Sequence, residues 1–174
     1  MRAPPLETER LTLRGHTEED FSEYAEMWGD PRVTRHVGGR PFTSEECWHR
    51  LLRGVGHWHV LGFGYWVLRE KRSTRFVGEV GFADLRREID PPLGATPEMG
   101  WVLSPWSHGQ GFATEAIAAV LAWANRQWGE RRLVCMIDPD NAPSLRVAAK
   151  VGFREYARTT YHGSPTILLE RSPA

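Results

Sequence analysis

The sequence has few cysteines, no long apolar run and no excess of charge of either sign. Of its 174 residues only two are cysteines, Cys47 and Cys135, and they lie far apart. Cys135 falls in the apolar run 133–137, where a buried free thiol is the usual role, so no disulfide scaffold is indicated. No apolar run approaches the roughly 20 residues of a membrane helix, and the N-terminus lacks a signal-peptide core. We therefore expect a cytoplasmic protein without membrane partners.

The charge balance excludes a second group of functions. Lys plus Arg and Asp plus Glu number 22 each, so no overall field draws the chain to nucleic acid, and an acidic ligand must meet a local site. His57 and His59 have no third ligand at metal spacing, so we expect no metal. No Pro-, Ser- or Gly-rich linker divides the chain, and its length suits a single domain over residues 1–174.

The most informative segment is glycine-rich. Residues 105–116 read Pro-Trp-Ser-His-Gly-Gln-Gly-Phe-Ala-Thr-Glu-Ala, between a predicted strand at 98–103 and an amphipathic helix that continues to Trp128. Gly109 and Gly111 permit positive φ and close approach of the backbone to a ligand. The first N–H groups of the helix lack intrahelical partners and lie at the positive end of its dipole. The segment predicts a site for a phosphorylated ligand, although a lone Gly-x-Gly is also found in simple tight turns.

A second segment, residues 137–153, reads Ile-Asp-Pro-Asp-Asn-Ala-Pro-Ser-Leu-Arg-Val-Ala-Ala-Lys-Val-Gly-Phe. Together the two segments resemble the cofactor-binding core of the GCN5-related N-acetyltransferases (GNAT). In that family the pyrophosphate loop reads Gln/Arg-x-x-Gly-x-Gly/Ala, and the next motif reads Asn-x-x-Ser/Ala followed by Lys-x-Gly-Phe. Residues 108–113, Asn141 with Ser144, and residues 150–153 fill those places. Segments 6–14, 30–33, 76–82 and 98–105 look like the branch that acetylates the N-termini of ribosomal proteins.

The resemblance implies acetyl-CoA as the cosubstrate, with its pantetheine arm between two splayed parallel strands, along the backbone of residues 101–103. Asn141 would hydrogen-bond the pantetheine amide, and it can cap a helix at the same time. The implied cofactor-binding residues are Trp101, Val102, Leu103, His108, Gly109, Gln110, Gly111, Phe112, Ala113, Thr114, Asn141 and Ser144.

The implied reaction is transfer of the acetyl group to a primary amine by direct attack in a ternary complex. At pH 7 an α-amine, with a pKa of about 7.7 to 8.0, costs only about 1 kcal/mol to deprotonate, whereas a lysine side chain costs roughly 4 to 5 kcal/mol. Glu98 is our candidate for the base because it begins the strand that would carry the thioester. Glu79 and Asp84 on the preceding strand are alternatives, because alternation alone does not tell which face meets the cleft.

The leaving thiolate needs a hydrogen-bond donor or acid, and here the chain departs from the wider family. Many relatives place a tyrosine seven residues after the asparagine, where this chain has Ala148. Ser144 is the remaining hydroxyl of the motif and our candidate for hydrogen bonding to the thiol. Tyr156 and Tyr161 are alternatives.

His108 is the second departure, since it fills the family's Gln or Arg position. A neutral imidazole supplies less charge to a pyrophosphate, and with an ordinary pKa near 6.5 it would make cofactor affinity fall as the pH rises through that region. The two departures leave open a catalytically silent acetyl-CoA-binding module or sensor. A dinucleotide-binding oxidoreductase is disfavoured, because position 114 is threonine instead of a third glycine.

The acceptor cannot be identified from sequence. A protein N-terminus, a lysine, an antibiotic amine and a small metabolite all remain open, for a monomer or a homodimer. We expect loops 33–43, 57–64 and 86–97 to border the acceptor site, with 91–97 exposed because its prolines cannot continue a strand. Trp101, Trp123 and Trp128 fit core positions, whereas Trp28, Trp58, Trp66 and Trp106 include possible walls for an apolar substrate group.

Periodicity and capping signals predict the remaining elements. Strands are expected at 11–14, 65–70, 75–85, 98–103, 133–137, 155–161 and 166–170. Helices are expected at 18–27, from Thr43 to near Gly54 or Gly56, and from Asp140 or Asn141 to Gly152. The strand–helix–strand unit at 98–137 makes one strand pair parallel. The fold class is therefore α/β, with a mixed, mostly antiparallel central sheet and helices on both faces, as in the GNAT acyltransferase fold.

Overall fold

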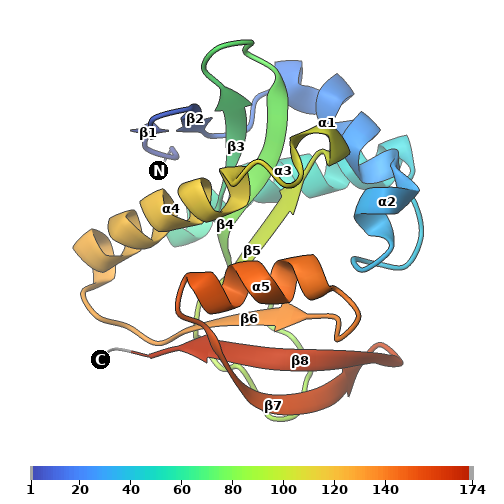
Figure 1. Cartoon of the computed structure of the whole chain (residues 1–174), viewed down its shortest axis with the longest axis vertical. Helices are drawn as coiled ribbons and strands as arrows, with labels where there is room; N and C mark the ends of the chain where they lie inside the picture. Colours follow the sequence, from blue (N-terminus) through green and yellow to red (C-terminus); the bar gives the residue numbers. More distant parts are fainter. Residues whose placement is uncertain (1, 173–174) are drawn as a thin grey trace.

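The computed structural model describes residues 2–172, in which an eight-stranded sheet carries helices on both faces (Figure 1). The strands are β1 (Leu6–Glu7), β2 (Leu11–Arg14), β3 (Tyr65–Glu70), β4 (Phe76–Ala83), β5 (Glu98–Leu103), β6 (Leu133–Ile137), β7 (Arg154–Tyr161) and β8 (Ser164–Arg171). The helices are η1 (Glu18–Asp20), α1 (Phe21–Gly29), α2 (Pro31–Thr34), α3 (Ser44–Leu61), η2 (Pro105–Ser107), α4 (Phe112–Trp128) and α5 (Ala142–Lys150). None of the helices in this range combines the length and apolarity needed to cross a bilayer.

The strand order is β1-β2-β3-β4-β5-β6-β8-β7, and within the described residues β5 and β6 are the one parallel pair. The predicted mixed, mostly antiparallel sheet is confirmed. Helices α4 and α5 cover one face, where Ile117 shares a buried cluster with Phe82 of β4. The other face carries α1, α2 and α3, where Tyr24 and Leu51 pack with Val67 of β3. Each face of the sheet therefore has its own apolar core.

Helix α3 continues past Gly54 and Gly56, where the sequence predicted its end. Glycine inside a helix costs roughly 1 kcal/mol relative to alanine, but tertiary packing outweighs that cost here. At Gly54 a Cβ would lie 3.3 Å from Nδ1 of His16, so the glycine permits a close approach of the helix. Beyond both glycines the helix still buries Trp58, which is 3% exposed. It ends instead at Gly62, whose φ of 74° gives the left-handed C-terminal conformation.

Most tryptophans are core residues. The interpretation of Trp28, Trp58 and Trp66 as walls of a substrate site is wrong, because each is at most 3% exposed. Their aromatic faces pack against other rings: Trp58 and Trp66 make an edge-to-face pair at 4.6 Å. Trp123 is buried, and Trp101 and Trp128 are partly buried against the same cluster, as predicted. Trp106 is partly buried, and its indole N–H donates to the backbone of Phe76 at 3.0 Å.

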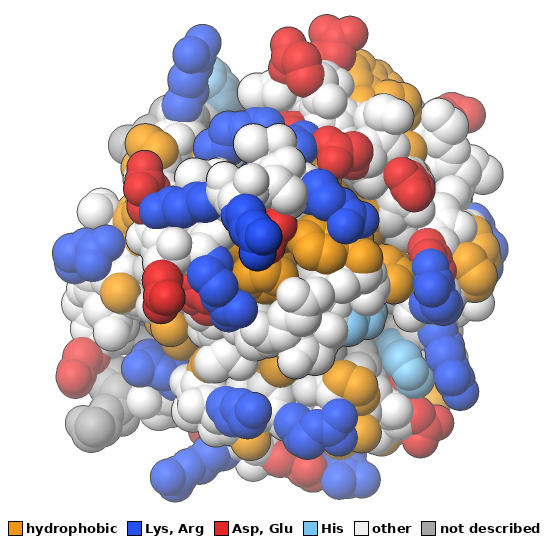
Figure 2. Space-filling view, turned by 45° about the horizontal axis from the view of Figure 1, so that its top comes forward, with side chains coloured by type: hydrophobic (Ala, Val, Ile, Leu, Met, Phe, Trp, Pro, Cys, Tyr) orange, Lys and Arg blue, Asp and Glu red, His pale blue; other side chains and the backbone are white. Residues whose placement is uncertain are grey.

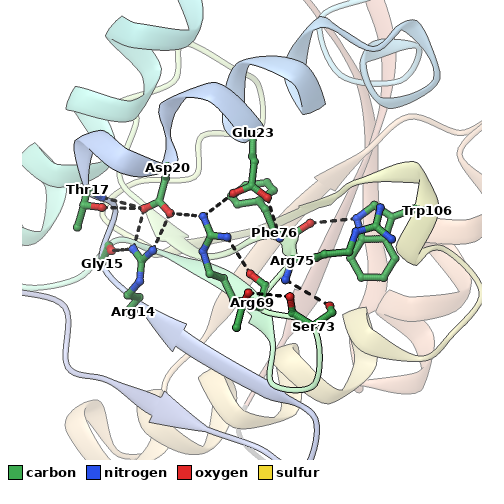
Figure 3. A network of polar contacts seen from close by, with 11 residues as sticks. Arg14, Gly15, Thr17, Asp20, Glu23, Arg69, Ser73, Arg75, Phe76 and Trp106 are labelled. Atoms are coloured by element: carbon green, nitrogen blue, oxygen red, sulfur yellow. Dashed lines mark hydrogen bonds and ion pairs between the residues drawn. The ribbon is translucent and has the colours of Figure 1, made fainter.

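A buried carboxylate, Asp20, joins the start of α1 to strands β2 and β3 (Figure 3). Its oxygens accept bonds from Nη1 and Nη2 of Arg14 at 2.6 and 2.7 Å and from Nη2 of Arg69 at 2.8 Å. The backbone N–H of Thr17 donates to it as well, at 3.0 Å. Burial alone would raise the pKa of Asp20, but the bonds from Arg14 and Arg69 outweigh burial and lower that pKa to about 2. The ionised carboxylate therefore stabilises the fold.

Asp20→Asn is expected to lower the free energy of unfolding at pH 7 by about 2 kcal/mol, since one pKa unit corresponds to about 1.4 kcal/mol. A depressed folded-state pKa contributes stability that is complete above the unfolded pKa, near 3.9, and is lost as the pH falls through the folded value near 2. Urea denaturation at pH 7 and at pH 3 checks this. The difference in free energy of unfolding between the native chain and the variant should be smaller at pH 3 than at pH 7. An equal difference at both pH values would contradict the electrostatic role of Asp20.

Candidate active site

The glycine-rich loop opens α4 as predicted. Gly111 is the N-terminal cap of α4 with φ 82°, and Gly109 has φ 74°, so both adopt conformations that side chains disfavour. Arg10, the residue before β2, holds this loop: its Nε donates to Glu115 at 2.7 Å and its Nη1 to the carbonyl of Gln110 at 2.9 Å. Its guanidinium also stacks on Phe112, 4.5 Å from the ring centroid. A rigid, backbone-lined cradle therefore lies at the positive end of the α4 dipole.

The cradle opens into a cleft between β5 and α5, beside the point where β5 and β6 part. These strands pair at a single register position, Glu98 opposite Val134, and beyond it they diverge, as the resemblance implied. The cleft has a volume of about 630 Å³. It is lined by Arg32, Val33, Arg35, His36, Val37, Trp101, Val102, Leu103, Ser107, His108, Gly109, Gly111, Phe112, Ala113, Thr114, Asn141, Pro143, Ser144, Arg146, Val147 and Lys150. All the predicted cofactor-binding residues are among them except Gln110, whose side chain donates to the carbonyl of Trp106 at 2.8 Å.

Three polar residues of the two motifs lie on this cleft with defined hydrogen bonds. Nε2 of His108 lies 2.9 Å from the carbonyl of Leu103, and because a carbonyl only accepts, this nitrogen carries a proton. Oδ1 of Asn141 accepts from the N–H of Ser144 at 3.2 Å, so Asn141 caps α5 as predicted. Across residues 2–172, the amide NH₂ of Asn141 and the hydroxyl of Ser144 make no hydrogen bond. Both groups are therefore available to a ligand.

The cleft also carries cations that the sequence reasoning missed. Arg32 and Arg35 lie on the α2 side, and Arg146 and Lys150 lie on α5. The spacing of four residues between the last two places them on one face of a helix, which was the available signal. Arg32 is paired with Asp30 at 2.6 Å, so Arg35, Arg146 and Lys150 are the cations that add positive charge to the cleft.

A side-chain contact joins two segments that are far apart in the sequence beside this cleft. Nδ1 of His36, just after α2, lies 3.0 Å from a carboxylate oxygen of Asp138, just after β6. Residues 33 and 35–37 therefore border this cleft, whereas the contact of loop 33–43 with the acceptor stays a prediction. Burial would raise the pKa of Asp138, but its bond with His36, the backbone bond from Asp140 and the charge of Arg35 together outweigh burial, and the pKa is lowered.

Glu98, the candidate base, begins β5 at its single pairing position with β6 and is 8% exposed; like the other candidate carboxylates it is not among the residues that line the cleft. Its carboxylate accepts from Nε and Nη2 of Arg87 at 2.5 and 2.8 Å. The guanidinium of Arg87 in turn lies 4.9 Å from the ring centroid of Tyr161. Arg87 was missed because it stands in a loop with no regular pattern. Tyr161 is thus placed beside Glu98 and Arg87 at this end of the sheet.

The two alternative carboxylates have other partners. Glu79 is buried, with His16 Nε2 at 3.0 Å and the Tyr24 hydroxyl donating at 3.3 Å. Burial would raise the pKa of Glu79, but the contact with His16, the charge of Arg50 and the bond from Tyr24 together outweigh burial, and the pKa is lowered. Asp84 follows β4 and forms an ion pair with Arg86 at 3.1 Å. Neither side chain lines the cleft.

Part of loop 86–97 does not border the site. Leu93, expected to be exposed, is 7% exposed and packs with Val134 and Leu168. The partly buried Tyr156 packs against the same cluster, away from the cleft. An apolar side chain between the prolines therefore anchors the segment on the sheet.

The surface charge is mixed, and the remaining histidines are not arranged as a metal site within residues 2–172. Lys and Arg side chains alternate with Asp and Glu on the face seen in Figure 2, as expected for a chain of balanced charge. In the part of the chain that the structure describes, no three His, Cys, Asp or Glu side chains group as metal ligands would. Nδ1 of His57 lies instead 3.0 Å from the carbonyl of Arg53.

Comparison with known proteins agrees with this geometry. Residues 10–154 match the family described as acetyltransferase (GNAT) domain. A solved structure of a putative GnaT-family acetyltransferase from Bordetella pertussis is 34% identical, with a TM-score of 0.86 over 97% of this chain and 99% of that one. An uncharacterized N-acetyltransferase, p20, of Bacillus licheniformis is 27% identical over 86% of this chain and 82% of its own length. Ribosomal-protein-S5-alanine acetyltransferase from Vibrio fischeri, 20% identical with a TM-score of 0.74 over 97% of this chain and 96% of that one, shares the fold.

Proposed function

The chain belongs to the acetyltransferase (GNAT) family and is an acetyl-CoA-dependent N-acetyltransferase, and from that premise we propose that it acetylates a primary amine by direct attack in a ternary complex. The observation that carries the proposal is the cleft that starts at the α4 cradle and runs along residues 101–103 of β5, the strand that Glu98 begins. A protein N-terminal α-amine and a small-molecule amine are the proposed acceptor classes.

The residues of the cleft fit acetyl-CoA. Its phosphates would lie against the backbone of Gly109 and Gly111, where the absence of a Cβ leaves the N–H groups accessible. The pantetheine arm would extend β5 along the edge that has diverged from β6, at residues 101–103, with the amide of Asn141 as a further donor. When bound, acetyl-CoA supplies an acetyl group already activated as a thioester. The protein then has to position the amine and move one proton.

Glu98 is proposed to accept that proton. It begins the strand that holds the cofactor, and its bonds from Arg87 fix the direction of its carboxylate. An α-amine costs only about 1 kcal/mol to deprotonate at pH 7, so even a weakly basic carboxylate suffices. The hydroxyl of Ser144 is proposed to donate a hydrogen bond to the departing sulfur. Cytoplasmic residence remains part of the proposal; both cysteines are free thiols.

The native chain is expected to acetylate the free α-amine of short peptides, and Glu98→Gln is expected to lower kcat about 100-fold, the usual contribution of a general base. The affinity for acetyl-CoA should stay unchanged, because Glu98 lies beyond the proposed pantetheine edge. Steady-state kinetics with mass-spectrometric detection of the acetylated peptide, and calorimetric titration of acetyl-CoA, measure both quantities.

The matched control is Glu88→Gln, which removes the charge of an exposed glutamate ten positions before Glu98. It should leave kcat within twofold of the native value. An unchanged kcat in Glu98→Gln would remove Glu98 from the mechanism. Binding of acetyl-CoA without transfer to any amine would instead establish the silent module and overturn the proposed function.

A further inference from the structure

A second, smaller cavity lies on the α1 and α3 face of the sheet, beside β5. Its volume is about 50 Å³. We call it the arginine pocket; its lining residues are Tyr24, Arg50, Arg53, Gly54, His57, Tyr65, Glu79, Ala83, Leu85 and Arg87. Space for a water molecule in the liquid is about 30 Å³, so the pocket suits a group of two or three heavy atoms. The arginine pocket is too small for a whole substrate, but it can hold a terminal group of one.

The arginine pocket adjoins the cofactor strand through Tyr65. In the sheet Tyr65 stands opposite Gly81 of β4, and Gly81 stands opposite Gly100 of β5. A Cβ at Gly100 would lie 2.1 Å from the Tyr65 hydroxyl, so the ring reaches across two strands to β5. Gly100 precedes Trp101, the first cofactor-cleft residue of that strand. The pocket and the cleft therefore meet near one point on β5.

Three guanidinium groups surround this cavity, and their carboxylate partners do not satisfy all of them. Arg87 gives two hydrogen bonds to Glu98. Nε of Arg50 lies 3.8 Å from Glu79, a carboxylate already in contact with His16 and Tyr24. The side chain of Arg53 makes no hydrogen bond or ion pair with any residue between 2 and 172. The pocket thus has one cation without a counter-charge.

The environment of Arg53 favours an anion from outside the chain. Arg53 is an exposed residue whose side chain borders the pocket, and partial desolvation and then the like charge of Arg50 lower its pKa. A carboxylate from a ligand would relieve both effects, since a guanidinium binds a carboxylate through two parallel hydrogen bonds. His57 lines the same pocket, and its Nδ1 lies 3.0 Å from the backbone carbonyl of Arg53.

We propose that the arginine pocket binds a carboxylate of the acceptor, held by Arg53 and Arg50, while the acceptor amine lies beside Glu98. The inference rests on the proposed function and narrows it. The acceptor class becomes primary amines that carry a nearby carboxylate, such as an amino acid or a peptide with an acidic first residue. No covalent step is added, because the carboxylate serves only to position the amine.

The test compares acceptors that differ only by carboxylate against carboxamide: Glu-Ala-Ala against Gln-Ala-Ala, and leucine against leucinamide. In at least one pair, kcat/KM of the native chain should be tenfold or more higher for the carboxylate member than for the carboxamide member. Most of this difference should be a lower KM for the carboxylate member. Arg53→Met keeps an apolar stem and removes the charge. The ratio of kcat/KM between the carboxylate and carboxamide members should therefore fall toward one, because KM for the carboxylate member rises. Arg53→Lys should restore part of it, and Arg126→Met, on the exposed side of α4, should leave it unchanged.

The outcomes separate the inference from the proposed function. Equal turnover of both members of each pair by the native chain, or an equal loss on both members in Arg53→Met, would overturn the arginine pocket as a carboxylate site and leave the acetyltransferase proposal standing. Failure to acetylate any amine, with acetyl-CoA bound, would overturn both. A preference that Arg53→Met removes, with the KM effect confined to the carboxylate member, supports the inference.

Discussion

Replacement of Gly111 by tryptophan is expected to weaken acetyl-CoA binding by more than 100-fold, which corresponds to more than about 2.7 kcal/mol. Gly111 caps α4 with φ 82°, and the nearest atom to a Cβ built there is a guanidinium nitrogen of Arg10 at 3.4 Å. An indole at this position would fill the cradle in which the phosphates of the cofactor are proposed to lie. Isothermal titration of acetyl-CoA into the native chain and the variant measures the loss.

The matched control is Gly62→Trp. Gly62 caps the other end of a different helix, α3, with a similar φ of 74°, and no atom lies within 4 Å of the position of its Cβ. Both variants thus carry the same left-handed strain of about 1 to 3 kcal/mol, but only Gly111 borders the cleft. Equal weakening of cofactor binding in the two variants would assign the effect to stability instead of the cradle. If the native chain does not bind acetyl-CoA, the acetyltransferase proposal is overturned.

Gly78→Ala is expected to lower the free energy of unfolding by more than about 3 kcal/mol, the sum of overpacking and strain in an unfavourable backbone region. Gly78 has φ 148°, and a Cβ there would lie 2.2 Å from the carbonyl oxygen of Val102 and 2.7 Å from Cα of Leu103. Both contacts are with backbone of β5, which cannot rotate away as a side chain does. Urea denaturation measures the loss, and calorimetry should show weaker acetyl-CoA binding, because β5 carries the proposed pantetheine edge.

Gly163→Ala provides the comparison for Gly78→Ala. Gly163 has φ 80° in the turn between β7 and β8, and no atom lies within 4 Å of the position of a Cβ there. Its substitution should cost only the conformational strain, about 1 to 2 kcal/mol. If the two alanine variants lost the same stability, the close approach of β4 and β5 at Gly78 would not be what requires glycine.

The proposed cofactor site was predictable because its parts are local. A strand, two glycines and a helix follow one another between Glu98 and Trp128, and each is recognisable from a short window of sequence. The cap at Asn141 and the end of its helix are equally local signals. The resemblance to the GNAT family rests on these same windows. The structure places the predicted residues other than Gln110 on one cleft, because two adjacent windows of a β-α-β unit are necessarily close in space.

The sequence by itself thus determined most of the longer elements, the parallel pair and the family, all of which depend on spacing within a few residues or on ordered motifs; it did not predict β1 or α2. Only the tertiary structure decided that α3 runs past Gly54, that Trp28 is core, and that Glu98 pairs with Arg87. It also brought Arg53 of α3 beside Tyr65 of β3. The physical reason is that burial and ion pairing depend on contacts between residues far apart in the chain. The propensity of a short sequence segment carries no information about those contacts.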